Sequence, residues 1–217
     1  MPLFNWPDMR WVDVAGAPGS GKSSLCDHLW PPHCIATAAQ TWPEEWLEFW
    51  RVTVGLLDEL QDHETFYLLK GMTSRSFNKM LNVSLIQSDA VYIQTGFAQR
   101  GLGFGWRLEQ RGKTEMVRDY FRLMPVSLGV VAIKCPEEIA VERNRLRPIE
   151  NRDFMVPLMR RSREILIEEM DARGVPVREI DTTGPIAEAR AELVEFAGGL
   201  AAQPKAFGLG GEMAAVS

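Results

Sequence analysis

The stretch Gly16-Ala17-Pro18-Gly19-Ser20-Gly21-Lys22-Ser23 lies between two segments of different character. Residues 11–15 before it, WVDVA, are mostly apolar and predict a short buried strand. Residues 24–30 after it predict a helix that ends before Pro31-Pro32. The stretch matches the spacing G-x-x-x-x-G-K-[ST], a motif that requires a strand before it and a helix after it. The chain therefore contains a strand–loop–helix unit of the α/β class.

The residue types of this motif suit phosphate groups. Without a Cβ, the glycines let successive backbone N–H groups turn toward phosphate oxygens. The start of the helix adds unpaired N–H groups and the positive end of its dipole. The Lys22 ammonium would neutralise the β- and γ-phosphates, and the Ser23 hydroxyl would ligate Mg²⁺. The sequence therefore predicts ATP and Mg²⁺ as ligands, bound by Gly16, Ala17, Pro18, Gly19, Ser20, Gly21, Lys22, Ser23 and Ser24.

The composition is that of an ordinary globular protein. Of 217 residues, 46% are hydrophobic and 24% are charged, which suffices for one α/β domain with a buried core. The net charge of −5 gives a field that does not favour nucleic acid or an anionic membrane. We therefore expect neither a nucleic acid polymer nor a membrane as partner. Any polyanion site must be a local group of Arg and Lys side chains.

The cysteines and the apolar segments indicate in which cellular compartment the protein is expected. Cys26, Cys34 and Cys135 are odd in number and form no C-x-x-C pair, which argues against a disulfide framework or a zinc site. Residues 1–10 lack the layout of a signal peptide. The longest uncharged apolar run, residues 123–133, is too short to span a bilayer. We therefore expect a soluble, cytoplasmic protein.

Hydrophobic periodicity and the positions of Gly and Pro divide the rest of the chain into elements. Helices are predicted over 44–60, 62–69, 75–85, 113–123, 136–147, 154–172 and 185–196, and strands over 33–37, 89–94, 129–135 and 175–180. Residues 97–106 are rich in glycine, so we expect them to be irregular or only partly helical. Alternating strands and helices predict a three-layer α/β/α fold with a parallel sheet of about five strands. Residues 1–197 would form one domain, and residues 198–217, without periodicity, a flexible tail.

The order of these parts resembles the nucleoside and nucleotide kinase group of P-loop phosphotransferases. The resemblance covers about residues 10 to 197 and rests most specifically on the P-loop, residues 16–23. It implies a P-loop kinase-like fold and an ATP-dependent kinase activity. It also implies a helical insert, residues 42–85, that covers the acceptor, and an Arg-rich lid, residues 143–163.

The resemblance places the lid around the segment VERNRLR, residues 141–147. In such kinases this segment closes over the phosphates during transfer. Arg143 and Arg147 are four residues apart, so a helix presents both on one face while Arg145 points away. The planar guanidinium matches phosphate oxygens and stays charged. The alternative is a solvated helix face whose arginines form ion pairs with nearby carboxylates.

The resemblance further implies an acidic residue that holds Mg²⁺ at the end of the central strand, followed by an Arg that contacts substrate or phosphate. Arg100 suits the second role, and the alternative for it is a surface ion pair. The acid is missing, because the strand ends in Gln94-Thr95. Asp89 lies at the wrong end of that strand for ligands that bind beyond the carboxyl ends. Asp13 remains a distant candidate, which leaves efficient Mg²⁺ coordination in question.

The insert holds the candidate acceptor-binding residues. Glu44 and Glu45 are the nearest carboxylates that could take a proton from an acceptor hydroxyl. They equally suit charges that stabilise the first turn of a helix. Arg75 and Lys79, four residues apart, could bind an acceptor phosphate. Seven aromatic side chains could stack on a nucleobase, although their helical spacing favours the core for most: Trp42, Trp46, Phe49, Trp50, Phe66, Tyr67 and Phe77.

These observations predict an ATP-dependent phosphotransferase that moves the γ-phosphoryl group to a small-molecule acceptor, with a nucleoside or nucleotide favoured. Its catalytic residues would be Lys22, Arg100, Arg143 and Arg147, with Glu44, Arg75 and Arg100 binding the acceptor and Ser23 the metal. The sequence is compatible with a homodimer. The alternative is a P-loop ATPase, nucleotide-binding switch or pseudoenzyme that acts through a protein partner.

Overall fold

The computed structural model describes residues 11–26, 44–60, 91–93, 96–126, 128–145 and 152–202. The strands are β1 (Trp11–Ala15), β2 (Val91–Ile93), β3 (Gly129–Lys134) and β4 (Val177–Asp181). The helices are α1 (Lys22–Cys26), α2 (Glu44–Leu60), α4 (Phe97–Glu109), α5 (Thr114–Leu123), α6 (Glu137–Arg145), α7 (Arg152–Ala172) and α8 (Ile186–Ala202). The strand predicted over 33–37 and the helices predicted over 62–69 and 75–85 lie outside the described residues.

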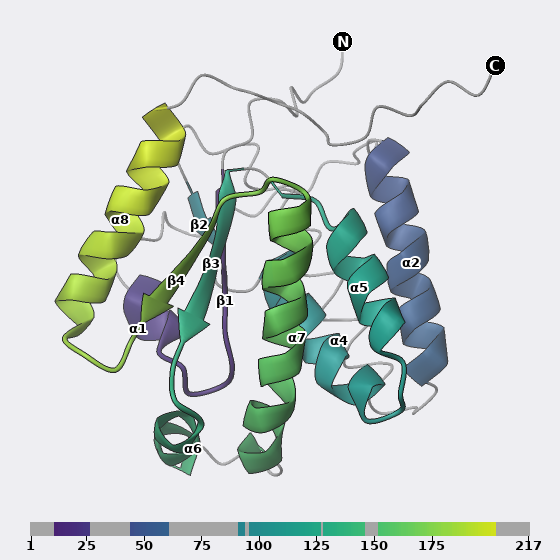
Figure 1. Ribbon diagram of the computed structural model, residues 1–217, viewed down its shortest axis with the longest axis horizontal. Helices are drawn as coiled ribbons and strands as arrows, with labels where there is room; N and C mark the ends of the chain where they lie inside the picture. The colour runs from purple at the N-terminus through teal and green to yellow at the C-terminus, as the bar shows by residue number, and fades with distance from the viewer. Residues whose placement is uncertain are drawn as a thin grey trace, which may run out of the picture.

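The strands form one parallel sheet in the order β2-β1-β3-β4. The predicted parallel α/β architecture is thus confirmed, with four strands among the described residues. Helices α1 and α8 cover one face of the sheet, and α4, α5 and α7 lie on the other, with α2 outside α5 (Figure 1). The arrowheads of β3 and β4 point toward α6, so α6 marks the end of the sheet where the carboxyl ends lie.

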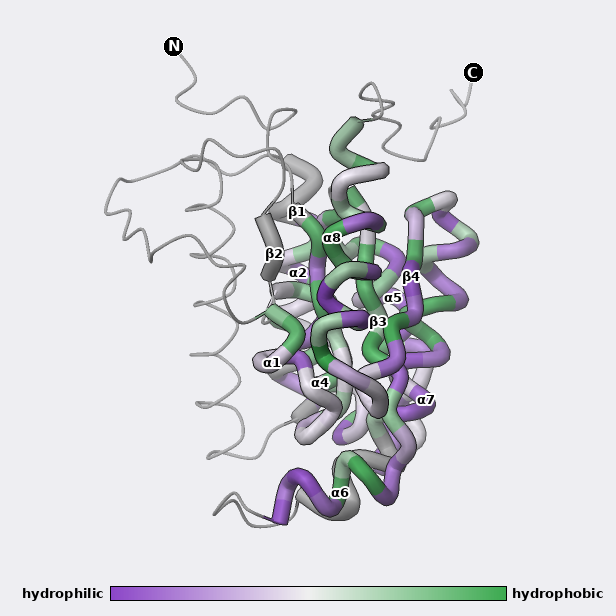
Figure 2. The backbone as a smooth tube through the Cα atoms, turned by 90° about the vertical axis from the view of Figure 1, so that its left-hand side faces the viewer, coloured by the Kyte–Doolittle hydropathy of each residue, from purple (hydrophilic) through white to green (hydrophobic). Residues whose placement is uncertain are grey.

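The alternation of side chains along β1 divides the core in two. Val12 and Val14 pack with Leu25 of α1 and Leu193 of α8. Ala15 packs on the opposite face with the large aromatic cluster of α2, α4 and α5. Because successive strand residues point to opposite faces, Asp13 also points toward α4. Figure 2 shows the hydrophobic run along β1 and β3 through the middle of the molecule.

Helix α4 contradicts the expectation that residues 97–106 are irregular or only partly helical. It runs unbroken over Phe97–Glu109, and two of its three glycines, Gly101 and Gly105, lie at close contacts that no side chain could occupy. A Cβ on Gly101 would lie 2.1 Å from the Phe121 ring, and one on Gly105 2.1 Å from Ser162 Oγ. Tertiary packing against α5 and α7 thus outweighs the low helix propensity of glycine.

The chain end and the lid region also differ from expectation. Helix α8 continues to Ala202, so residues 198–202, which were expected to belong to a flexible tail, are helical. Its residue Leu200 packs onto β3, where a Cβ on Gly129 would lie 2.9 Å from the Leu200 side chain. Residues 152–163 belong to the long helix α7, packed along α4 and α5. Among the described helices, none combines the length and the apolar character needed to span a lipid bilayer.

Candidate nucleotide-binding site

The P-loop connects β1 to α1, as the motif predicts, although α1 begins at Lys22, two residues earlier than expected. Gly19 and Gly21 have positive φ angles of 76° and 90°, which side chains with a Cβ rarely adopt. A Cβ on Gly19 would lie 2.2 Å from the carbonyl oxygen of Ala140 in α6. A Cβ on Gly16 would lie 2.7 Å from Cβ of Ile133 in β3. Glycine at positions 16 and 19 is therefore required by the neighbouring elements as well as by the loop.

Lys22 reaches back across the loop. Its Nζ donates hydrogen bonds to the carbonyl oxygens of Gly16 (2.6 Å) and Ala17 (2.8 Å). The ammonium is thus held against the backbone of the loop itself. Ser23 and Ser24 are exposed in the first turn of α1. Ser23 is therefore accessible to a metal ion.

The first turn of α4 is tied to both β1 and the P-loop. The Ala98 N–H donates to Asp13 Oδ2 (3.1 Å), and the Gly16 N–H donates to Gln99 Oε1 (3.1 Å). Asp13 is 1% exposed, and a Cβ on Gly96 would lie 2.5 Å from its Oδ1. A carboxylate at the start of a helix also interacts favourably with the helix dipole. Asp13, which the sequence offered as a distant candidate for a metal ligand, thus anchors the start of α4.

Arg100 lies in the same first turn and is half-buried. Tyr120 of α5 donates its hydroxyl to the Phe97 carbonyl (2.9 Å), which adds a third anchor. Burial raises the pKa of Tyr120 well above its usual value, the negative charge of Asp13 adds to the rise, and the positive charge of Arg100 opposes it. The structure therefore gathers Asp13, Arg100 and Tyr120 around the start of α4, beside the P-loop.

An Asp13→Ala variant should lower the free energy of unfolding by about 1.5–3 kcal/mol, because the buried Ala98 N–H loses a charged acceptor. Urea unfolding measures the change. Asp119→Ala is the matched control, since the Asp119 carboxylate makes an exposed ion pair with Arg122 and should contribute at most about 1 kcal/mol. Equal losses in the two variants would show that the buried bond from Asp13 to α4 contributes no more to the free energy of unfolding than an exposed ion pair.

The end of β4 joins the P-loop to Arg143. The Thr182 hydroxyl donates to the Ser20 carbonyl, and Arg143 Nη2 donates to the Thr182 carbonyl (2.9 Å). A Cβ on Gly21 would lie 3.1 Å from the Thr182 side chain. Arg143 also lies 3.8 Å from Cys135 Sγ, whose pKa is raised mainly by burial. The predicted lid residue Arg143 is thus placed next to the loop by a backbone contact.

Four other arginines of the predicted lid, whose side chains the structure describes, form ion pairs. Arg145 pairs with Glu142 (2.8 Å), Arg160 with Glu137 (3.2 Å) and Arg161 with Glu164 (3.1 Å). Arg163 pairs with Glu179 and donates to the Ile133 carbonyl. These contacts agree with the ion-pair alternative for these four residues. The Arg excess that predicted a broad lid over 143–163 mostly balances neighbouring carboxylates.

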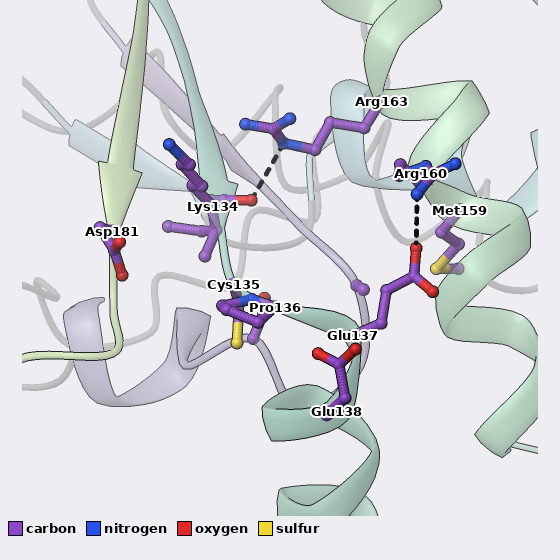
Figure 3. Close-up of a pocket in the computed structure, with 12 residues that line it drawn as sticks. Lys134, Cys135, Pro136, Glu137, Glu138, Met159, Arg160, Arg163 and Asp181 are labelled. Carbon is purple, nitrogen blue, oxygen red and sulfur yellow. Dashed lines mark hydrogen bonds and ion pairs between the residues drawn. The ribbon is translucent and has the colours of Figure 1, made fainter.

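A cavity of about 400 Å³ lies at the carboxyl end of β3, between the P-loop, α6 and α7 (Figure 3). It is lined by Ala17, Ser20, residues 133–138, Met159, Arg160, Arg163 and Asp181. The Arg160–Glu137 pair crosses one side of it, and Asp181 lies on the opposite side (Figure 3). Ligands of parallel α/β sheets bind beyond the carboxyl ends of the strands. The cavity is therefore a candidate ligand site that adjoins the P-loop.

Several predicted site residues are not placed. Arg147 and Arg75 lie outside the described residues, as do Lys79 and Gln94-Thr95. Glu44 and Glu45 are the first two residues of α2, but their side chains are also outside the described set. Of the aromatic residues in the insert, Phe49 is fully buried and packs edge-on against Phe97 at 5.0 Å, which confirms the core interpretation for it.

Sequence reasoning missed the supporting residues of the loop. Gln99 and Thr182 bond to loop atoms, and Asn144 lies against Gly19. For Thr182 a signal existed, because it directly follows the carboxyl end of a strand. A charged Asp13 within an apolar strand was likewise a sign of a buried partner. Nothing in the local sequence distinguishes Gln99 or Asn144 from surface residues of a helix.

Comparisons with known proteins fit the fold. Models of protein families and curated proteins gave no match. Among solved structures, deoxyadenosine kinase from M. mycoides with bound dATP is similar, with a TM-score of 0.56, 9% sequence identity, and coverage of 85% of this chain and 97% of that chain. The structure of the same enzyme with bound dCTP has a TM-score of 0.49 and 10% sequence identity, and it covers 87% of this chain and 99% of that chain. The chain therefore has a P-loop kinase-like fold.

Proposed function

We propose that this protein is an ATP-dependent phosphotransferase that moves the γ-phosphoryl group to a small-molecule acceptor, with a nucleoside or nucleotide favoured. The observation that carries the proposal is the P-loop itself, in which Gly19 and Gly21 have positive φ and the Lys22 ammonium lies against the carbonyl oxygens of Gly16 and Ala17. The fold likeness to a deoxyadenosine kinase supports a nucleoside or nucleotide as acceptor.

The loop residues fit a nucleotide with its metal. The Lys22 ammonium would exchange its bonds to Gly16 and Ala17 for bonds to the β- and γ-phosphates. The accessible Ser23 hydroxyl would hold Mg²⁺. The metal ion would neutralise negative charge on the β- and γ-phosphates. The adjoining cavity offers room for the part of a ligand that extends beyond its phosphates.

In the transfer, the bond from the γ-phosphorus to the β–γ bridging oxygen breaks, and an acceptor oxygen bonds to the γ-phosphorus. The proton of an acceptor hydroxyl passes to a carboxylate or to solvent, and ADP leaves. Arg143 and Arg147 would offset the charge on the transferring group, while Arg100 would orient the acceptor. The anchors of α4 hold Arg100 beside the loop.

Release of ADP tests the proposal, measured with ATP·Mg²⁺ and a panel of nucleosides, nucleotides, sugars and amino alcohols. We expect ADP release to increase with one class of nucleoside or nucleotide, and the phosphorylated product to appear in equal amount. ADP release that no acceptor increases would identify an ATPase. Binding of ATP without turnover would identify a pseudoenzyme. Either of these results would overturn the phosphotransferase assignment.

A further inference from the structure

Asn144 of α6 carries an unexplained buried amide. The residue is 2% exposed, and neither Nδ2 nor Oδ1 has a hydrogen-bond partner among the residues that the structure describes. Buried polar side chains in folded proteins are almost always hydrogen-bonded, so each exception calls for an explanation. Its neighbour Arg145 is exposed and paired with Glu142. Burial is therefore specific to the Asn144 face of the helix.

That face lies against the P-loop. Ala140 and Asn144 are four residues apart and share one side of α6. The position that a Cβ of Gly19 would take is 2.2 Å from the Ala140 carbonyl oxygen and 3.0 Å from Asn144 Nδ2. Glycine at position 19 thus lets α6 bring an amide donor directly to the turn of the loop. The backbone N–H groups of this turn are those that the motif directs at phosphates.

A second unpartnered group lies in the loop at the next position. Ser20 is 1% exposed, and its hydroxyl has no hydrogen-bond partner within the described part of the chain. Other buried hydroxyl groups in the described part of the chain do have partners: Thr53 donates to Phe49, Tyr120 to Phe97, Ser162 to Glu109 and Thr182 to Ser20. Unpaired hydroxyl and amide groups therefore coincide at the phosphate loop.

We propose that Asn144 binds the nucleotide, its Nδ2 amide donating a hydrogen bond to an oxygen of the phosphate chain held by the P-loop. The proposal rests on the function proposed above and adds a contact that no motif assigns. A neutral amide is a suitable donor here, because a bond to a charged phosphate is strong where water is excluded. The bond would also pair the amide that is otherwise unsatisfied.

Replacement of Asn144 by leucine tests the proposal through two effects of opposite sign. Leucine has a similar size but no polar atoms, so the free protein should be as stable as the wild type or more stable in urea. Binding of ATP·Mg²⁺, measured by calorimetry, should weaken about 10- to 100-fold with the loss of a hydrogen bond to a charged group. Asn144→Asp should weaken binding further, because its carboxylate repels phosphate.

Arg145→Ala is the matched control on the same helix and should leave ATP affinity unchanged. Wild-type affinity in Asn144→Leu would overturn the proposal, because the amide would then make no bond to the nucleotide. A loss of stability in the free protein would also overturn it, because the amide would then be satisfied within the fold. The Lys22→Ala variant distinguishes a failure of the proposed nucleotide site from a failure of the proposed Asn144 contact. If wild-type protein binds ATP and Lys22→Ala does not, the nucleotide site holds and only the role of Asn144 is in question. If the wild type binds no ATP, both proposals fail.

Discussion

A Lys22→Ala variant should lose about a hundred- to a thousandfold in ADP production, because the only ammonium of the P-loop would be gone. The Lys22 Nζ lies within 2.8 Å of two loop carbonyls, and we expect it to exchange these bonds for bonds to the phosphates. A steady-state assay of ADP release, with the acceptor identified by the panel, measures the loss in kcat.

Two further variants define what this lysine contributes. Lys22→Arg keeps the charge but replaces a compact ammonium by a planar guanidinium, so it should restore little of the activity. Lys113→Ala removes an exposed ammonium that pairs with Glu59 and should leave turnover unchanged. Unchanged ADP production in Lys22→Ala would contradict the assigned role of the loop.

Gly19→Ala should be the most destabilising single change in the loop. Position 19 has a φ of 76°, which costs a residue with a Cβ about 1–2 kcal/mol. The added Cβ would also lie 2.2 Å from the Ala140 carbonyl oxygen, and relief of such overpacking costs about 1–3 kcal/mol more. We therefore expect a loss of roughly 2–5 kcal/mol in urea unfolding, together with weaker nucleotide binding as α6 moves away from the loop.

Substitutions at two other glycines separate the cost of backbone strain from the cost of overpacking. Gly112 has a φ of 70°, and no described atom lies within 4 Å of the position that a Cβ would take, so Gly112→Ala measures strain alone. Gly103 lies in α4, also with open space, and its replacement by alanine should stabilise the protein by about 0.4–1 kcal/mol. If Gly19→Ala cost no more than Gly112→Ala, the close approach of α6 to the loop would be wrong.

Most of the described elements follow from local sequence. The helix predicted over 44–60 has these bounds in the structure, and the strands around residues 129–135 and 175–180 agree within two residues. Periodicity reports these elements because strand and helix backbones impose fixed spacings on apolar side chains. The glycine-rich helix α4 escaped prediction, because packing of Gly101 and Gly105 against other elements decides its conformation.

In the candidate site, too, some residues could be predicted from local sequence and others depend on tertiary contacts. Loop residues 16–23 could be read directly, since a phosphate-binding turn needs glycines and a lysine at set spacings. The Arg-rich segment could not be interpreted from composition, because which arginine faces phosphate depends on where carboxylates of other elements lie. In the structure Arg143 contacts Thr182, whereas Arg160 and Arg163 face Glu137 and Glu179.

By itself, the sequence determined the strand–loop–helix unit around residues 16–23, the parallel α/β class and most of the described helices and strands, because each depends on residues close together in the chain. Only the tertiary structure decided what surrounds that loop. Gln99 bonds to Gly16 across 83 positions, and Ala98 bonds to Asp13 across 85. Such contacts depend on strand register and helix packing, which bring distant segments to one end of the sheet. The same packing places Asn144 against Gly19.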